Sequence, residues 1–158
     1  MADKITEEKQ KKRAPKRAAA KKKEHIVLSK SKRKTSVARA SARSGTGKIR
    51  VNGTDINMIE PVEIRSMMLS SIKISQLGSD ISKKTDITVN VRGGGYSSQA
   101  QAVGAAIARC IADYDESGSV RKELMEYDRS LLVDDSRRVE PKKFLGPKAR
   151  ARFQTSYR

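Results

Sequence analysis

The chain has 158 residues, and its 35 Lys or Arg residues against 18 Asp or Glu residues give a formal net charge of +17. This length is enough for one domain of ordinary size, and the charge indicates a polyanionic partner, nucleic acid before an anionic membrane. Aromatic residues are only 4% of the chain, which argues against a protein that stacks bases on an aromatic platform. The single Cys excludes an internal disulfide bond. No apolar run approaches the roughly 20 residues of a membrane span, so we expect neither a membrane segment nor a secretory signal.

The positive charge is concentrated in three blocks. Residues 1–24 hold 10 basic and 4 acidic side chains, residues 30–50 hold 8 basic and none acidic, and residues 137–158 hold 8 basic and 1 acidic. Residues 51–136 hold 9 basic and 13 acidic side chains, so the middle of the chain is mildly acidic. Blocks of like charge usually serve as interaction segments. We therefore expect a disordered basic N-terminal arm (1–24), a globular domain (25–136) and an extended basic C-terminal tail (137–158).

Alternation of side chains predicts the strands. Residues 35–43 place Ser and Ala on one face and Arg on the other, and residues 48–52 alternate again after the turn residues 44–47. We expect these two segments to pair as a hairpin, with small side chains inward and arginines outward. Residues 86–92 form the clearest strand, and residues 25–28 are a short β-prone run.

A first helix is predicted between the hairpin and the strand of residues 86–92. It begins at Pro61, whose missing N–H costs little at an early helical position. Gly78 marks its end or the loop beyond.

Two further helices follow the strand. Apolar residues at i, i+3, i+4 spacing predict an Ala-rich helix, N-capped by Ser97 or Ser98, that continues to about Tyr114 and can lie close against a sheet. A shorter helix is predicted over residues 120–127. The expected order is hairpin, helix, strand, helix, helix, and Pro and Gly disfavour regular structure from residue 137 onward.

The Gly93–Gly95 loop joins a strand to a helix amino terminus, which can hold a phosphate through its unpaired N–H groups. The loop lacks the Gly-Lys-Ser/Thr ending of a Walker loop and the third glycine of a dinucleotide fingerprint. It resembles the Gly-rich loop of kinases of the galactokinase–homoserine kinase type, but the chain shows no paired Mg²⁺ ligand and base. Three interpretations stay open: tight packing of backbones that lack Cβ atoms, a contact with RNA phosphate, and a nucleotide site.

The sequence predicts no metal site, no cofactor and no catalytic centre. His25 and Cys110 are the only residues of their kinds, and neither has a local ligand partner. Cys110 lies on the apolar stripe of its helix, so we expect a small core residue. The acidic residues at helix ends and loops are expected to be solvated charges: Asp113, Asp115, Glu116, Asp134 and Asp135.

Two basic segments indicate contact with nucleic acid. Arginines at every second strand position would line one face and suit phosphate contacts, although a solvated strand face is the alternative. The block of residues 30–50 contains Lys30, Lys32, Arg33, Lys34, Arg39, Arg43, Lys48 and Arg50. The C-terminal block has spaced arginines and two aromatic residues. From Phe144 onward it could extend to about 50 Å at ~3.3 Å per residue, which implies insertion into something large and anionic.

A series of motifs, in order, resembles the small-subunit ribosomal protein S-nine family in its archaeal and eukaryotic form. The ending QTSYR is typical of that form, the resemblance covers about residues 25–158, and residues 1–24 lie outside the family pattern. The matching motifs are KRKTSVA (32–38), GKIRVNG (47–53), EP (60–61), VNVRGGG (89–95), SQA (98–100), YDRSLL (127–132), DSRR (135–138), EPKKF (140–144) and residues 148–158.

The resemblance implies an α+β fold like the second domain of ribosomal protein S-five, with a four-stranded sheet packed on helices and a left-handed βαβ crossover. It implies a structural, non-enzymatic protein of the small ribosomal subunit in the cytoplasm. The implied partners are 16S-type rRNA in the subunit head, neighbouring head proteins and the peptidyl-site tRNA, whose anticodon stem-loop the C-terminal tail would reach.

Carried onto this chain, the resemblance implies tRNA contacts at Ser156, Tyr157 and Arg158. The alternative function is a small phosphate- or nucleotide-binding protein that uses the Gly93–Gly95 loop. The implied rRNA contacts are Lys32, Arg33, Lys34, Arg39, Arg43, Arg92, Gly93, Gly94, Gly95, Arg137, Arg138, Lys142, Lys143, Lys148, Arg150 and Arg152.

Overall fold

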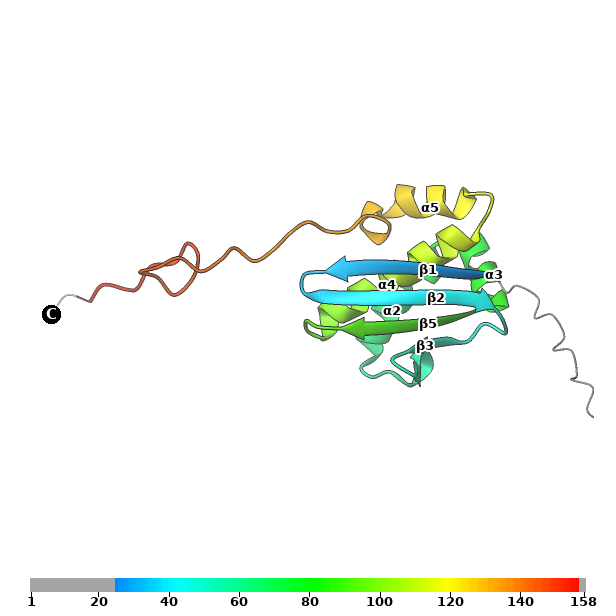
Figure 1. The fold of residues 1–158 in the computed structure, drawn as a ribbon, viewed down its shortest axis with the longest axis horizontal. Helices are drawn as coiled ribbons and strands as arrows, with labels where there is room; N and C mark the ends of the chain where they lie inside the picture. The colour runs from blue at the N-terminus through cyan, green and yellow to red at the C-terminus, as the bar shows by residue number, and fades with distance from the viewer. Residues whose placement is uncertain (1–24, 157–158) are drawn as a thin grey trace, which may run out of the picture.

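A computed structural model describes residues 25–156, so the predicted N-terminal arm and the last two residues lie outside the described part. One mixed sheet is its centre, with strand order β1-β2-β5-β3-β4 (Figure 1). β2 is antiparallel to both β1 and β5, whereas β3 is parallel to β5. The strands are β1 (Ile26–Arg33), β2 (Ser36–Ser44), β3 (Ile49–Val51), β4 (Thr54–Asp55) and β5 (Thr85–Arg92).

The helices cover one face of this sheet and leave the other face open (Figure 1). α4 lies across β1 and β2 and also packs against α2. Between residues 25 and 156, no helix is long and apolar enough to cross a membrane. The helices are α2 (Val62–Ile74), α3 (Gln76–Lys84), α4 (Tyr96–Tyr114) and α5 (Ser119–Tyr127), with short 3₁₀ turns η1 (Ile56–Met58) and η2 (Arg129–Leu131).

The core is made of small residues from β2 and α4 together with larger ones from β5. Every second residue of β2 is buried, which confirms the predicted alternation, and its inward residues are Ser36, Ala38, Ala40 and Ala42. Ile87 and Val89 of β5 are fully buried beside them. Ala102 and Ala106 of α4 are also fully buried. Because these side chains are short, the predicted close approach of helix and sheet is possible.

The predicted hairpin of residues 35–43 and 48–52 is wrong. β5 lies between β2 and β3, so these two strands do not pair. The hairpin is formed instead by β1 and β2, and Lys34 in their turn has a positive φ of 53°. Alternation identifies a strand but not its neighbour, which depends on long-range packing of the whole sheet.

The sheet has five strands rather than the expected four. The additional strand is β4, a two-residue segment that pairs with β3 through Arg50–Asp55 and Val51–Thr54. The segment from β3 through α2 and α3 to β5 joins two adjacent parallel strands, which makes it a βαβ unit.

Two predicted helix boundaries are wrong: the end of the first helix, at Ser75, and the start of α4, near Ser98. The first helix does not continue to Gly78, because Ser75 is extended and its Oγ accepts a 3.0 Å hydrogen bond from the Gly78 N–H, which starts α3. α4 begins at Tyr96 with Gly95 as its N-cap, two or three residues before the predicted caps Ser97 and Ser98, and Ser98 Oγ accepts a 3.1 Å hydrogen bond from the Gly95 N–H. A serine three residues into a helix can therefore cap it by folding back.

Candidate nucleic-acid interface

The open face of the sheet carries rows of basic side chains. Residues that lie opposite each other on adjacent strands project from the same face. Lys30 therefore shares a row with Arg39 and Asn90, and Lys32 shares the next with Val37 and Arg92. We call this surface the basic sheet face and define it by its exposed cations: Lys30, Lys32, Arg39, Arg43, Lys48, Arg50 and Arg92.

Two hollows on this face place cations beside neutral hydrogen-bonding groups. One is lined by Arg39, Arg92 and the amides of Asn52 and Asn90. The second is lined by basic side chains together with hydroxyl groups: Ser41, Arg43, Thr46, Lys48, Arg50 and Thr88, beside Asp86 and Asn90. Adjacent strands are about 4.8 Å apart and alternate residues about 7 Å apart, so the face offers a regular array of donors for phosphate oxygens.

The two carboxylates on this face are engaged with N–H groups. Asp86 Oδ1 accepts hydrogen bonds of 2.8 Å from Thr46 N–H and 3.0 Å from Lys48 N–H, and these bonds hold the pKa of Asp86 below its ordinary value. Asp55 accepts a 3.0 Å bond from Asn57 N–H at the start of η1. The carboxylates therefore organise the turns at the edge of the face, and the cations outnumber them.

Gly93 and Gly94 have a structural reason to be glycine. Their φ angles are +79° and +70°. A Cβ on Gly93 would lie 2.6 Å from Thr35 O, and one on Gly94 would overlap Ser36 Oγ. Gly95 has an ordinary φ of −109° and open space where its Cβ would be. The loop therefore packs tightly against the β1–β2 turn at two of its three glycines, which favours the packing interpretation for those two.

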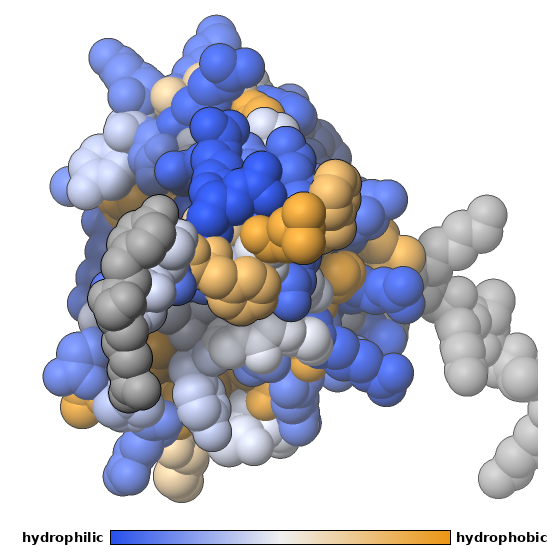
Figure 2. Space-filling view, turned by 90° about the vertical axis from the view of Figure 1, so that its left-hand side faces the viewer, coloured by the Kyte–Doolittle hydropathy of each residue, from blue (hydrophilic) through white to orange (hydrophobic). Residues whose placement is uncertain are grey.

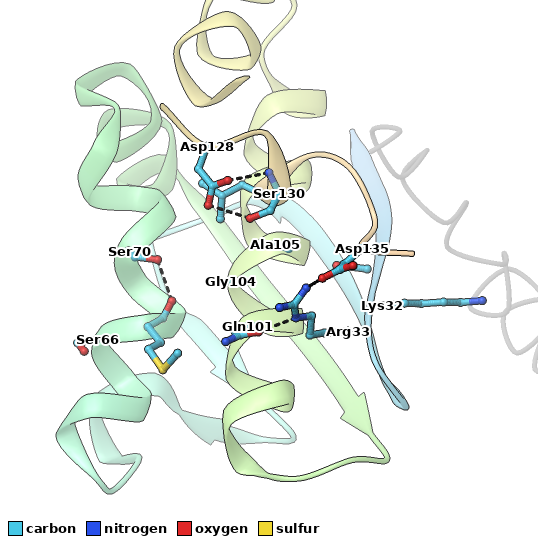
Figure 3. A pocket seen from close by; sticks show the side chains of 13 residues that line it. Lys32, Arg33, Ser66, Ser70, Gln101, Gly104, Ala105, Asp128, Ser130 and Asp135 are labelled. Atoms are coloured by element: carbon cyan, nitrogen blue, oxygen red, sulfur yellow. Dashed lines mark hydrogen bonds and ion pairs between the residues drawn. The ribbon is translucent and has the colours of Figure 1, made fainter. Parts of the chain in front are cut away.

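Arg33 is placed apart from the basic sheet face. Figure 3 shows Lys32 pointing away from the helices, whereas Arg33 turns toward α4. Its Nε donates a 2.7 Å hydrogen bond to Gln101 Oε1, and its guanidinium forms an ion pair with Asp135. These residues line a cavity between α2, α4, η2 and the end of β1. Neighbouring strand residues point to opposite faces, so the structure separates Arg33 from the other predicted rRNA contacts in its block.

Asp135 is not the solvated charge that the sequence predicted, and Asp134, although its side chain is 44% exposed, has defined partners. Asp134 Oδ1 accepts bonds of 2.8 Å from Arg109 and 3.2 Å from Lys32 N–H. Partial burial acts to raise the pKa of Asp134, but these hydrogen bonds outweigh it and the pKa lies below its ordinary value. Asp135 pairs with Arg33 and, two residues along the chain, with Arg137 at 2.7 Å. Lys32, Arg33 and Arg109 come from β1 and α4, and local sequence does not show contacts with these distant elements.

Asp115 and Cys110 also have defined partners. The Asp115 carboxylate accepts hydrogen bonds from Ser117 and Val120 N–H, which lower its pKa and join α4 to α5, so it is also not a simple solvated charge. Cys110 is fully buried, as predicted, and accepts a hydrogen bond from Ser29 Oγ at 3.2 Å. Across residues 25–156, no three metal-ligating side chains come together.

Comparison with known proteins identifies the family. The family described as Ribosomal protein S9/S16 matches residues 31–158. The chain belongs to this family. A protein named Small ribosomal subunit protein uS9 from Halobacterium salinarum is 45% identical over 133 residues, which cover 84% of this chain and 99% of that protein. The same name is carried by a Picrophilus torridus protein (47% over 133 residues, 84% and 97% covered) and a Dictyostelium discoideum protein (42% over 141 residues, 85% and 95% covered).

Membership in this family confirms the archaeal and eukaryotic resemblance and the structural, ribosomal role. The family is not one of enzymes, so a kinase-like, catalytic use of the Gly93–Gly95 loop is excluded. The α+β class is confirmed as well, since a mixed sheet and four α-helices make up the described domain.

The C-terminal tail of this chain has no helix or strand between residues 137 and 156. It projects away from the domain (Figure 1) and faces the viewer in Figure 2, where mostly hydrophilic residues surround a small hydrophobic group. The chain turns back at residues 144–152, where Arg152 Nη1 donates a 3.2 Å hydrogen bond to Phe144 O. This turn makes the tail shorter than a fully extended chain.

The residues of this tail that were predicted to contact RNA differ in their hydrogen bonds within the chain. Arg150 makes two hydrogen bonds to Glu140, of 2.9 and 2.7 Å, and these bonds lower the pKa of Glu140. The remaining predicted contacts here are exposed: Arg137, Arg138, Lys142, Lys143, Lys148, Arg152 and Ser156. Tyr157 and Arg158 lie outside the described residues, so the structure places one of the three predicted tRNA contacts.

Three further cations lie on the basic sheet face beside the residues of the family-implied set. Lys30, Lys48 and Arg50 belong to the basic block of residues 30–50, but they were not among the individual contacts that the resemblance implied. The strand order brings β3 beside β5 and so places Arg50 on the same face as Arg39. The charge block indicated these residues, and the strand adjacency that groups them with Arg39 was the missing information.

Proposed function

We propose that the protein binds 16S-type rRNA in the head of the small ribosomal subunit through the basic sheet face. The observation that carries this proposal is the open face itself, on which seven exposed cations accompany two carboxylates that are already hydrogen-bonded to N–H groups. Phosphate contacts from such a face give affinity and orientation without requiring stacked aromatic residues.

The family membership supports the cytoplasmic ribosome as the location, with neighbouring head proteins as further partners. We also propose that the βαβ unit from β3 to β5 is the left-handed crossover of an S-five second-domain fold. The parallel pairing of β3 with β5 and the helices between them support the βαβ part of this classification, and its left hand is what the family resemblance implies.

We further propose that the C-terminal tail reaches the anticodon stem-loop of the peptidyl-site tRNA. The tail is basic, projects from the domain and ends in the predicted contacts Ser156, Tyr157 and Arg158. An arginine offers a forked donor for phosphate oxygens. Arg150 and Arg152 would lie behind this tip, against rRNA.

A salt series tests the rRNA interface. Affinity of the full chain for a head fragment of 16S-type rRNA should fall linearly with log salt, with a slope of about 0.9 for each duplex phosphate contacted. The triple variant Arg39→Gln, Arg43→Gln, Arg92→Gln should reduce that slope by about 3 × 0.9, or roughly 2.7.

The matched control removes the same charge from exposed helical lysines: Lys73→Gln, Lys84→Gln and Lys122→Gln. It should change the slope little, because these residues lie on α2, α3 and α5 rather than on the sheet. Equal losses from the two triple variants would contradict a specific sheet interface and leave only diffuse charge attraction.

Truncation tests the tail. A chain that ends at Phe153 should still enter small subunits, as judged by co-sedimentation with the particles, but those subunits should hold peptidyl-site tRNA more weakly. Failure of the shortened chain to enter particles would show that the tail is an assembly element instead.

A further inference from the structure

The segment at which the tail leaves the domain is held by ionic contacts from three directions. Asp135 pairs with Arg33 at the end of β1 and with Arg137 in the tail itself, the latter at 2.7 Å. Asp134 bonds to Arg109 of α4 at 2.8 Å. We call these five residues the tail-root cluster. It joins the tail to the first strand and the longest helix, although those partners are far away along the chain.

Three backbone groups extend the same contacts. Asp134 Oδ1 accepts a hydrogen bond from Lys32 N–H at 3.2 Å, and Asp135 Oδ1 accepts one from Arg137 N–H at 2.8 Å. Arg109 also donates to Lys30 O. The cluster therefore supplies partners to the backbone N–H of Lys32 and the backbone C=O of Lys30 at the edge of β1, groups that another strand could otherwise pair with. It also orients Arg137, the first basic residue of the tail.

The inner part of the cluster is better shielded than the other ion pair of the tail. The side chains of Asp135, Arg109 and Arg33 are 13%, 16% and 23% exposed, whereas those of Asp134 and Arg137 are 44% and 81% exposed. In the Glu140–Arg150 pair the values are 50% and 84%. Shielded pairs with several hydrogen bonds are screened less by solvent and salt than exposed ones, so we expect the Arg33–Asp135 pair to keep its geometry in the ionic surroundings of RNA.

We propose that Asp134 and Asp135 are positioning residues that anchor the root of the tail to β1 and α4 and so set the direction in which the tail leaves the domain. In this arrangement Arg33 acts as an internal partner of Asp135 rather than as a contact to rRNA. The functional consequence rests on the proposed tail contact with tRNA, whereas the anchoring itself does not.

Whether tRNA affinity falls or rises when the two carboxylates are removed distinguishes a positioning role from a purely electrostatic one. Removing two carboxylates makes the chain more positive, so electrostatic attraction alone would strengthen its binding to any RNA. Loss of positioning has the opposite effect on the tail contact, because a tail that samples many directions loses more conformational freedom on binding. Weaker tRNA binding by a more positive variant is therefore diagnostic.

The experiment compares the full chain with Asp134→Asn/Asp135→Asn, with the conservative Asp135→Glu and with Asp80→Asn. The last is the control, since Asp80 pairs at 3.0 Å with Lys83 within α3, a helix that contributes no residue to the tail-root cluster. Hydrogen exchange of the Lys32 and Arg137 amides, which donate to the two carboxylates, should quicken by about tenfold in the double variant. Asp80→Asn should leave both amides unchanged, and Asp135→Glu should retain most of the protection of Arg137.

The second readout is the affinity of peptidyl-site tRNA for small subunits that contain each variant. We expect the double variant to weaken it by about three- to tenfold, with rRNA binding unchanged or slightly tighter. Unchanged exchange at Lys32 and Arg137 would overturn the anchoring, and tighter tRNA binding would overturn positioning in favour of charge alone. If truncation at Phe153 leaves tRNA affinity intact, the tail–tRNA contact fails as a function, while the exchange result still decides whether the anchor exists.

Discussion

Replacing Gly94 by Ala should destabilise the domain, whereas replacing Gly95 should not. Gly94 has a φ of +70°, and a left-handed backbone costs an L-residue about 1–2 kcal/mol. A new Cβ would also overlap Ser36 Oγ and lie 2.6 Å from Ser98 Oγ. These hydroxyls are hydrogen-bonded to each other at 2.9 Å, and Ser36 donates to Gly93 O at 2.8 Å. Disturbing two such bonds costs about 1 kcal/mol each, so the expected total is roughly 3–4 kcal/mol.

The assay is urea unfolding of the full chain followed by circular dichroism, with thermal unfolding as a second measure. For a domain of this size the loss corresponds to a fall in Tm of about 10 °C or more. Gly95→Ala is the control, because its φ of −109° suits any residue and no atom lies within 4 Å of the added Cβ. The reasoning is refuted if Gly94→Ala stays within about 0.5 kcal/mol of the parent chain, or if Gly95→Ala is equally destabilised.

Two other changes test other parts of the fold, and the control Gly95→Ala also tests the glycine loop. Asp86→Asn should lower stability at neutral pH by weakening the bonds to Thr46 and Lys48. Because the folded pKa of Asp86 is lowered, its contribution is complete above the ordinary Asp pKa of about 3.9 and is lost as the pH falls through the folded value. The stabilities of parent and variant should therefore begin to converge below about pH 4 and meet once the pH lies below the folded pKa. Ile107→Ala should cost about 2–5 kcal/mol in urea unfolding, because Ile107 is fully buried in the core; a loss below about 1 kcal/mol would contradict tight packing there. Gly95→Ala should leave rRNA affinity unchanged if the glycine loop is purely structural, and a clear loss of affinity with stability intact would indicate a phosphate contact at that backbone.

Local patterns in the sequence predicted the elements whose burial repeats regularly. β2 alternates Ala with Arg, β5 alternates apolar with polar residues, and α4 has an unbroken apolar stripe, so each was found from its period. The extended conformation of Ser75 was not found, because it rests on contacts such as the 2.5 Å bond from its Oγ to Glu123 in α5.

The basic residues of the candidate site were predicted from charge and family motifs. Which of them lie on the open face of the sheet and which lie on the helix-covered face could be assigned only from the observed pairing of the strands. Arg33 and Lys32 are adjacent in sequence, yet one binds Asp135 and the other lies on the open face. Asp135 is about a hundred residues away along the chain, and no local pattern predicts a contact at that distance.

The position of β2 and β5 inside the sheet has a consequence for how RNA could be bound. Both strands have hydrogen-bonded neighbours on each side, so the backbone beneath Arg39 and Arg43 is held by ladders in both directions. The backbone at Arg92 lies beyond the β3 pairing and is held by its ladder to β2. Folding has already removed the freedom of that backbone, and binding then needs to order only the ends of the side chains. The basic sheet face is thus a preorganised surface, and its cations keep their spacing whether or not RNA is present.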